Sequence, residues 1–379
     1  MGCSEEARSW IEIFSAAGES SAFWSGVAGR LGAARLSGML STERGREELR
    51  RLTGRNAGPP DDRRLARTLD FLEGERNGVI CRSDPGYPRL LLEIEGNPPL
   101  IFFSGDPEVA SRPSIGIVGS RKASRRGLAV SCALARELSR RGLLVVSGLA
   151  LGIDSAAHTG ALQGPGGTCA VLGCGIDVPY PRDNAGLSVD IAAAGCVFSE
   201  FLPGAPPRKH HFPRRNRILS GLSLGIVVVE AGRKSGAMST ARWAADQGRE
   251  VFAVPGPVEH EGSRGPHLLI REGAVLVESA EDVIRELPPR ASVPEPFDVT
   301  EKRAGLPGIS PRLLSRLSAD ERRIVEALDL APKHIDELSR ICHISATGLL
   351  TLLLGLEMRG IISSCGGGTY ALPAGPLRI

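Results

Sequence analysis

A run of basic residues without an acid lies between residues 207 and 223, which read PRKHHFPRRNRILSGLS. No Asp or Glu occurs from residue 201 to residue 229, and like charges that crowd together repel one another unless an anion neutralises them. Phe212 lies within this run, and a nucleobase can stack on an aromatic ring while cations hold the phosphate backbone. The segment therefore predicts a track for single-stranded nucleic acid, and a solvated basic loop is the alternative. Its candidate contacts are Lys209, Phe212, Arg214, Arg215, Asn216 and Arg217.

Two further loops combine glycine and cations directly after an apolar run. Residues 115–119 (IGIVG) precede Ser120 and Arg121, and residues 226–230 (IVVVE) precede a loop with Arg233 and Lys234. Backbone amides at the start of a helix bind phosphate, and an arginine adds a bidentate contact. Both loops therefore predict anion sites, the first at Gly119, Ser120 and Arg121; a tight turn with an exposed arginine is the alternative.

The same motifs argue against nucleotide cofactors and catalysis. Gly116 lies inside its strand, so the spacing does not match G-x-G-x-x-G, and the loop at 230–240 lacks the G-K-[ST] of a P-loop. Asp154 and His158 are four residues apart and could pair, but no nucleophile accompanies them, so we interpret them as structural. We expect a binding protein with no catalytic residues, no metal and no cofactor.

The composition restricts nucleic-acid affinity to local patches, because the 379 residues carry a formal net charge of only +3. The eight cysteines form no C-x-x-C pair and no zinc-finger spacing, which favours a reduced compartment over a disulfide framework. No apolar stretch approaches the roughly 20 residues of a membrane span, and the first residues do not resemble a secretory signal. We expect a soluble, cytoplasmic protein with no membrane partner.

The elements that must position these loops alternate between strand and helix from residue 114 onward. Short apolar runs such as SIGIVG, LLVVSG, CAVLG, GIVVVEA and VFAVPG are separated mostly by helical stretches, which is typical of a parallel sheet covered on both faces. The predicted fold class is α/β, a Rossmann-like doubly wound parallel sheet. Ligands bind such sheets beyond the carboxyl ends of the strands, where the glycine loops and the basic segment would meet.

The chain is predicted to contain four parts: a small helical domain (1–75), the Rossmann-like domain (80–287), a proline-rich linker (288–317) and a winged-helix domain (318–379). The winged helix is inferred from three helices followed by a hairpin. Its expected recognition helix, SATGLLTLLLGLEM, contains no Lys or Arg, whereas a protein that reads duplex DNA presents a basic face. We therefore expect a weak auxiliary contact or a protein-contact role for this domain.

The motifs PPLIFFSG, GIVGSR, SGLALGIDSAAH and HFPRRNRILSGLS, in this order, resemble the bacterial DNA-processing protein A family, also called DprA or Smf. The resemblance covers about residues 87–287. It implies a homodimer that binds single-stranded DNA on its Rossmann-like domain, protects incoming strands and helps load the recombinase RecA in natural transformation. It also implies DNA contacts at Arg121, Lys209 and Phe212, with residues 215–217 as a further candidate.

Two other functions remain as alternatives. The segment EAGRKSGAMSTARW resembles a loop of nucleoside-monophosphate phosphoribohydrolases, whose pattern G-G-x-G-T-x-x-E ends in a glutamate. Here Thr240 is followed by Ala241, Arg242 and Trp243, so that carboxylate is missing. The second alternative is a transcription regulator built on the winged helix, which the acidic composition of that domain disfavours.

Overall fold

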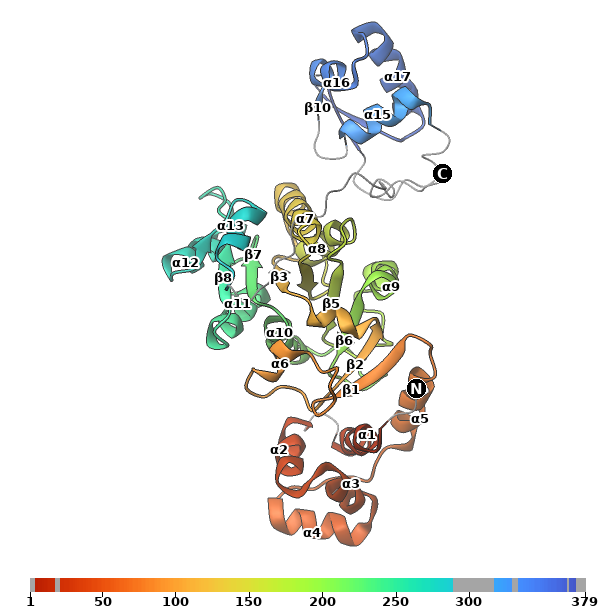
Figure 1. Cartoon of the computed structure of the whole chain (residues 1–379), viewed down its shortest axis with the longest axis vertical. Coiled ribbons are helices and arrows are strands. Elements are labelled where there is room, and N and C mark those ends of the chain that lie inside the picture. The colour runs from red at the N-terminus through yellow and green to blue at the C-terminus, as the bar shows by residue number, and fades with distance from the viewer. Residues whose placement is uncertain (1–3, 18–20, 289–316, 329–332, 367, 373–379) are drawn as a thin grey trace. The chain divides into compact units, whose positions relative to one another are not determined.

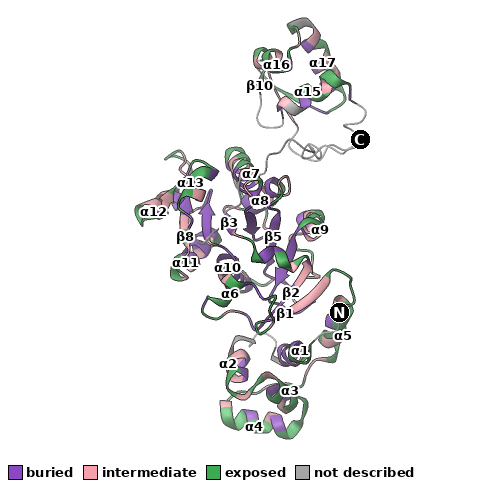
Figure 2. Cartoon of the chain, in the orientation of Figure 1, coloured by how far each residue is buried: buried purple, intermediate pink, exposed green. Residues whose placement is uncertain are grey.

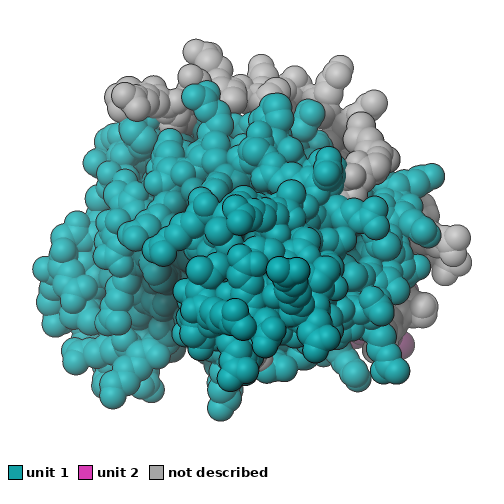
Figure 3. All heavy atoms as spheres, turned by 90° about the horizontal axis from the view of Figure 1, so that it is seen from below, with its two compact units in different colours: residues 1–297 teal, residues 298–379 magenta. Residues whose placement is uncertain are grey.

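The structure is a computed structural model that describes residues 4–17, 21–288, 317–328, 333–366 and 368–372. The chain divides into two compact units, residues 1–297 and 298–379. Figure 3 shows one face of the first unit as spheres. The predicted linker at 288–317 lies outside the described residues except for its two end residues. The four domain boundaries therefore stay predictions.

A nine-stranded sheet lies at the centre of the first unit, with strand order β1-β2-β6-β5-β4-β3-β7-β8-β9 (Figure 1). Strands β3 to β9 run parallel to one another, as the apolar runs predicted. The strands are β1 (Asn77–Cys81), β2 (Leu100–Gly105), β3 (Ser114–Val118), β4 (Leu144–Ser147), β5 (Thr168–Leu172), β6 (Cys196–Ser199), β7 (Gly225–Val228), β8 (Glu250–Ala253) and β9 (Val275–Leu276).

At one edge, two antiparallel strands from the preceding segment, β1 and β2, extend the parallel sheet predicted from residue 114 onward. Strand β2 pairs antiparallel with both β1 and β6. Antiparallel neighbours need no long crossover, and only the four-residue helix α6 (Arg89–Leu92) lies between β1 and β2. This hairpin-like pair extends the sheet away from the loops that carry the candidate site.

Helices cover both faces of the sheet, and the buried residues gather along its strands (Figure 2). On β7, Ile226 and Val228 join one core cluster with Leu219 of α10, whereas Val227 joins another with Leu138 of α7, as the two-residue period of a strand requires. The helices are α7 (Arg125–Arg140), α8 (Ile153–Ala161), α9 (Ala185–Ala194), α10 (His211–Gly221), α11 (Gly236–Asp246), α12 (Arg264–Arg271) and α13 (Ala280–Arg285).

Five helices precede the sheet and share a core with its antiparallel edge. Trp10, Phe14 and Trp24 from these helices belong to one buried cluster with Leu100 and Phe102 of β2. The helices are α1 (Glu5–Ala17), α2 (Ser21–Leu31), α3 (Ala33–Ser41), α4 (Glu43–Thr53) and α5 (Asp62–Leu72). This packing brings α1 and α5 close to the loops at the edge of the sheet.

The second unit contains the three helices and the hairpin that the sequence predicted. These elements are α15 (Ala319–Leu328), β10 (Lys333–His334), α16 (Ile335–Cys342), α17 (Ala346–Met358), β11 (Ser363–Gly366) and β12 (Thr369–Ala371). They enclose their own core, which includes Leu338, Leu349 and Leu353. Among the described residues of the whole chain, none of the helices combines the length and the apolar composition that crossing a bilayer requires.

Candidate nucleic-acid interface

A cavity of about 250 Å³ opens where the strand order reverses, beyond the carboxyl ends of β3 and β7. Strand β3 lies between β4 and β7, and crevices of this kind are where doubly wound sheets bind ligands. The wall of the cavity includes Gly119, Ser120, Arg121, Phe212, Asn216, Ser235, Gly236 and Thr240. The two predicted anion loops and the basic segment therefore contribute to one site.

The turn after β3 is held against the end of β7. A side-chain Cβ at Gly119 would lie 2.5 Å from a carbon of Ile153 and 2.8 Å from the carbonyl oxygen of Glu230, so this position requires glycine. The amide of Ser120 donates to the same Glu230 carbonyl at 2.6 Å. Burial disfavours ionisation of Glu230, but hydrogen bonds from the amide and hydroxyl of Ser124 and the charge of His260 hold the pKa of its carboxyl below the usual value. The Glu230 carboxylate thus anchors the start of α7.

Helix α11 directs its amino terminus toward this cavity. Ser235 precedes the helix, and its buried hydroxyl makes no hydrogen bond with any described atom. Gly236 and Ala237 follow in the first turn, whose amides have no partner within the helix, and both line the cavity. A helix amino terminus with a free hydroxyl is suited to a phosphate oxygen. Arg233 and Lys234 are exposed in the preceding loop.

Arg121 and Phe212 stand together between two cavities. The central carbon of the Arg121 guanidinium lies 5.2 Å from the centre of the Phe212 ring, and both side chains also line a neighbouring cavity of about 70 Å³. Tyr180 lines that smaller cavity, with its ring centre 5.7 Å from that of Phe212. The structure thus brings together the cation and the ring that the sequence assigned to one strand-binding site.

Arg215 faces inward. Only 5% of its surface is exposed, and its guanidinium donates to the carbonyl oxygens of Gly148, at 2.7 Å, and Val171. Burial raises the pKa of the neighbouring Asp154 to about 6, although Arg215 and the amides of Gly148 and Ala150 favour its ionised form. Arg215 and Asp154 both line the cavity, Arg215 with its guanidinium held by backbone carbonyls, and its predicted contact with a strand stays a prediction.

The basic segment also has a counter-charge that its sequence does not show. Glu200 Oε2 lies 3.0 Å from Arg214 and 2.5 Å from Arg217, and the Glu200 side chain is almost completely buried. Asn216 is buried as well and donates to the carbonyl oxygen of Gly236 at 3.3 Å. The run itself contains no acid, but Glu200, which directly follows β6, reaches α10 through space and offsets part of its charge.

Other predicted residues have simpler environments. Lys209 is exposed in the turn before α10, three residues before Phe212, and lines neither of the two cavities. Asp154 and His158 do not pair: His158 Nδ1 lies 2.7 Å from the hydroxyl of Thr168, which donates onward to a carbonyl.

The Ser235 hydroxyl was not among the contacts predicted from the sequence. The position of Ser235 between a glycine-containing loop and a helix could have indicated it. Within the described residues, no His, Cys, Asp and Glu cluster could hold a metal.

Known protein families match residues in both units of the chain. The family model of DNA recombination-mediator protein A matches residues 78–288, and that of the DprA winged helix domain matches residues 309–368. Protein Smf of Escherichia coli is 36% identical over 312 residues, which covers 80% of each chain. DNA processing protein DprA of Streptococcus pneumoniae is 45% identical over 203 residues, 54% of this chain and 72% of that protein.

Solved structures show the same relationship. DprA of S. pneumoniae superposes with a TM-score of 0.62 at 33% identity, covering 76% of this chain and 99% of the other. DprA of Helicobacter pylori, described for its single-stranded DNA binding mode, superposes with a TM-score of 0.51 at 28% identity, covering 55% and 94%. With its cavity at the reversal of strand order, its paired Arg121 and Phe212 and these matches, the chain belongs to the DNA recombination-mediator protein A family, whose members are named DprA or Smf.

Proposed function

We propose that the chain binds single-stranded DNA, without sequence preference, across the carboxyl ends of β3 and β7. The observation that carries this proposal is the convergence of Arg121, Phe212 and the amino terminus of α11 on one cavity. A cation, an aromatic ring and free amides are the groups that a flexible strand with phosphates and bases can use. The H. pylori relative, whose structure was described for this kind of binding, supports the assignment.

Different residues would contact the phosphate and the base of a nucleotide. A phosphate would accept hydrogen bonds from the first amides of α11, from the Ser235 hydroxyl and from Arg121, while Lys209 would attract the strand from the rim. A base would stack on Phe212, with Tyr180 beside it. Stacking on a ring does not discriminate strongly between bases, so the binding would tolerate any sequence. Arg215 would hold the floor through its bonds to backbone carbonyls and add positive charge beneath the strand.

The wider role follows from the family and from this site. We propose that the chain protects incoming strands and helps load RecA during natural transformation and recombination. It would act in the cytoplasm as a homodimer, so that two sites hold one strand and affinity rises with strand length. The carboxyl of Asp154 accepts from the amides of Gly148 and Ala150, and that of Glu230 accepts from the amide and hydroxyl of Ser124. We therefore propose a structural role for both carboxyls and a binding role for the cavity.

Fluorescence anisotropy with labelled oligo-dT and a matched duplex competitor tests this function. Arg121→Ala and Lys209→Ala should weaken binding and flatten its salt dependence, and Phe212→Ala should weaken it by about 1–3 kcal/mol. Arg44→Ala, an exposed arginine on α4, serves as the control. Equal affinity for duplex, or unchanged affinity in all three variants, would exclude the proposal.

Dimerisation and RecA loading need separate measurements. Light scattering should give the mass of two chains at micromolar concentration. RecA should form filaments faster on strands coated with single-strand-binding protein when the chain is present, and Phe212→Ala should reduce this effect. A monomer, or no change in RecA filament formation, would restrict the proposal to strand binding.

A further inference from the structure

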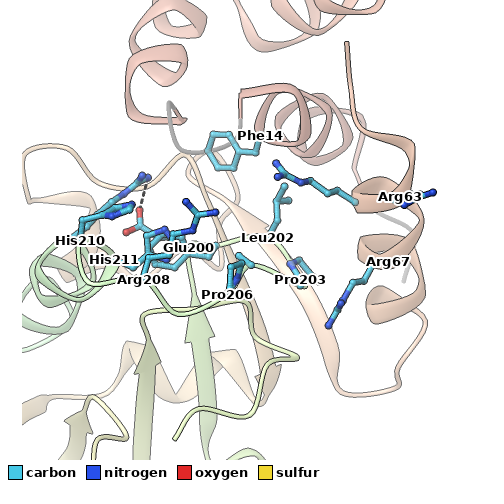
Figure 4. A pocket seen from close by; sticks show the side chains of 15 residues that line it. Phe14, Arg63, Arg67, Glu200, Leu202, Pro203, Pro206, Arg208, His210 and His211 are labelled. Carbon is cyan, nitrogen blue, oxygen red and sulfur yellow. Dashed lines mark ion pairs between the residues drawn. The ribbon is translucent and has the colours of Figure 1, made fainter. Parts of the chain in front are cut away.

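A second cavity, of about 290 Å³, lies between the amino-terminal helices and the loop that follows β6 (Figure 4). One wall comes from Phe14 of α1 and from α5, and the other from residues 200–206 and 208–214. Its volume is close to the lower end of the range of small-molecule sites. Of the residues that line this cavity, only Arg214 is among the DNA contacts predicted from the sequence.

The cavity combines a basic rim with an apolar floor. Arg63, Arg64 and Arg67 of α5 line it on one side, with Arg208 and Arg214 on the other. Phe14, Leu202, Pro203 and Pro206 form much of the remaining wall, and Figure 4 shows these side chains around the same opening. An inorganic anion would leave the apolar surface unused, and an apolar peptide would not use the positive charge of the rim. A nucleotide uses both, through its phosphate and its base.

The acids near the cavity are already neutralised. Glu200 is paired with Arg214 and Arg217, and Asp177 accepts from Arg67 at 2.6 Å. The side chain of Arg63 is exposed and makes no ion pair or hydrogen bond with the described residues. Of the five arginines that line the cavity, Arg64, Arg67 and Arg214 pair with Asp61, Asp177 and Glu200. The exposed guanidinium of Arg63 is therefore the charge at this rim that a phosphate would meet.

The cavity also borders the site described above. Residues 208–214 supply Arg208, His211 and Arg214 to this cavity, whereas Phe212 from the same turn lines the cavities at the end of the sheet. Lys209 lies exposed in that segment. A strand that stacks a base on Phe212 and continues along residues 208–211 would therefore reach the cavity that α5 lines.

We propose that this cavity receives a nucleotide of the same DNA strand, its phosphate against the arginines of α5 and its base on the apolar floor. The proposal rests on the proposed function and extends it, because it gives the amino-terminal helices a direct part in strand binding. Arg63 is the contact that can be tested most cleanly, since its side chain supports nothing else in the described structure.

The decisive comparison is Arg63→Glu against Arg44→Glu in the full chain. Both arginines are exposed at the second position of a helix, α5 and α4, where an acid is favourable, so both variants should fold equally well. Anisotropy with oligo-dT of increasing length should show a several-fold rise in Kd for Arg63→Glu on long strands only. Its salt slope should fall by about 0.7, the value for one phosphate contact on a single strand. Arg44→Glu should match the wild type.

Other results of these binding measurements would contradict either the proposed function or the cavity proposal. If the wild type does not bind oligo-dT, the proposed function itself fails. If Phe212→Ala weakens binding while Arg63→Glu and Arg44→Glu behave alike, only the cavity proposal is overturned. Competition with dTMP distinguishes a free nucleotide from a nucleotide of the strand. If dTMP binds the wild type but not Arg63→Glu, and if Arg63→Glu affects the Kd of short and long strands alike, the cavity binds free nucleotides and the strand proposal is overturned. Photo-crosslinking with 4-thiothymidine strands should label the peptide that carries Arg63 and Arg67.

Discussion

The guanidinium of Arg121 lies over the ring of Phe212, although one residue follows β3 and the other belongs to the first turn of α10. A cation over an aromatic face is attracted by the ring and fixes its orientation. In the proposed binding mode, a base that stacks on this face would displace the guanidinium, which would then bind the adjacent phosphate. Stacking and charge neutralisation would therefore be coupled at this site.

This coupling predicts that Arg121→Ala and Phe212→Ala are not additive. Their combined effect on the free energy of binding oligo-dT should differ from the sum of the single effects by about 0.5–3 kcal/mol, because each residue positions the other. A double-mutant cycle by anisotropy measures the difference. A cycle that closes to within about 0.5 kcal/mol would show that the two side chains act independently.

The orphaned hydroxyl of Ser235 gives a second prediction. Ser235→Ala removes no hydrogen bond within the described structure, so the thermal midpoint of unfolding should stay close to that of the wild type. If the hydroxyl donates to phosphate, the Kd for oligo-dT should rise several-fold, in line with the loss of one hydrogen bond to a charged group. Loss of stability with unchanged affinity would contradict this role.

Glu200 should matter for stability more than an ordinary ion-pair partner. Glu200→Ala leaves Arg217, which is largely buried, and Arg214 without their carboxylate, and breaking a buried pair costs about 3–5 kcal/mol. Glu93 pairs with Arg249 but is 60% exposed, so Glu93→Ala should cost about 1 kcal/mol or less. Urea unfolding measures both, and equal losses would argue against the buried pair.

The stability of the fold should also depend on pH through His158. Burial lowers the pKa of His158 to about 3 from its usual 6.5, so below pH 6.5 the unfolded chain takes up a proton that the folded chain does not. Acidification therefore favours unfolding. The difference in unfolding free energy between the wild type and His158→Gln should shrink by up to about 1.4 kcal/mol per pH unit between 6.5 and 3. A constant difference across this range would exclude the buried neutral imidazole.

Local pattern was enough to predict much of the fold. The runs around Ile115–Val118, Leu144–Ser147 and Gly225–Val228 are all strands of the sheet, because continuous apolar runs separated by helices form parallel strands. A glycine after an apolar run also predicted the two loops of the cavity, which follow β3 and β7. The motifs around Arg121 and Phe212 were specific enough to identify the family.

What the sequence determined by itself was thus the type and order of the elements and the loops that carry cations. Only the tertiary structure decided which cations line the cavity. Arg215 follows Phe212 by three residues and precedes Leu219 by four, so one face of α10 turns it onto the sheet, where carbonyls hold it. Glu200, which follows β6, pairs with two arginines of α10, and residues of α5 line a cavity together with the loop after β6. These relations depend on contacts between distant segments, and spacing along the chain does not encode such contacts.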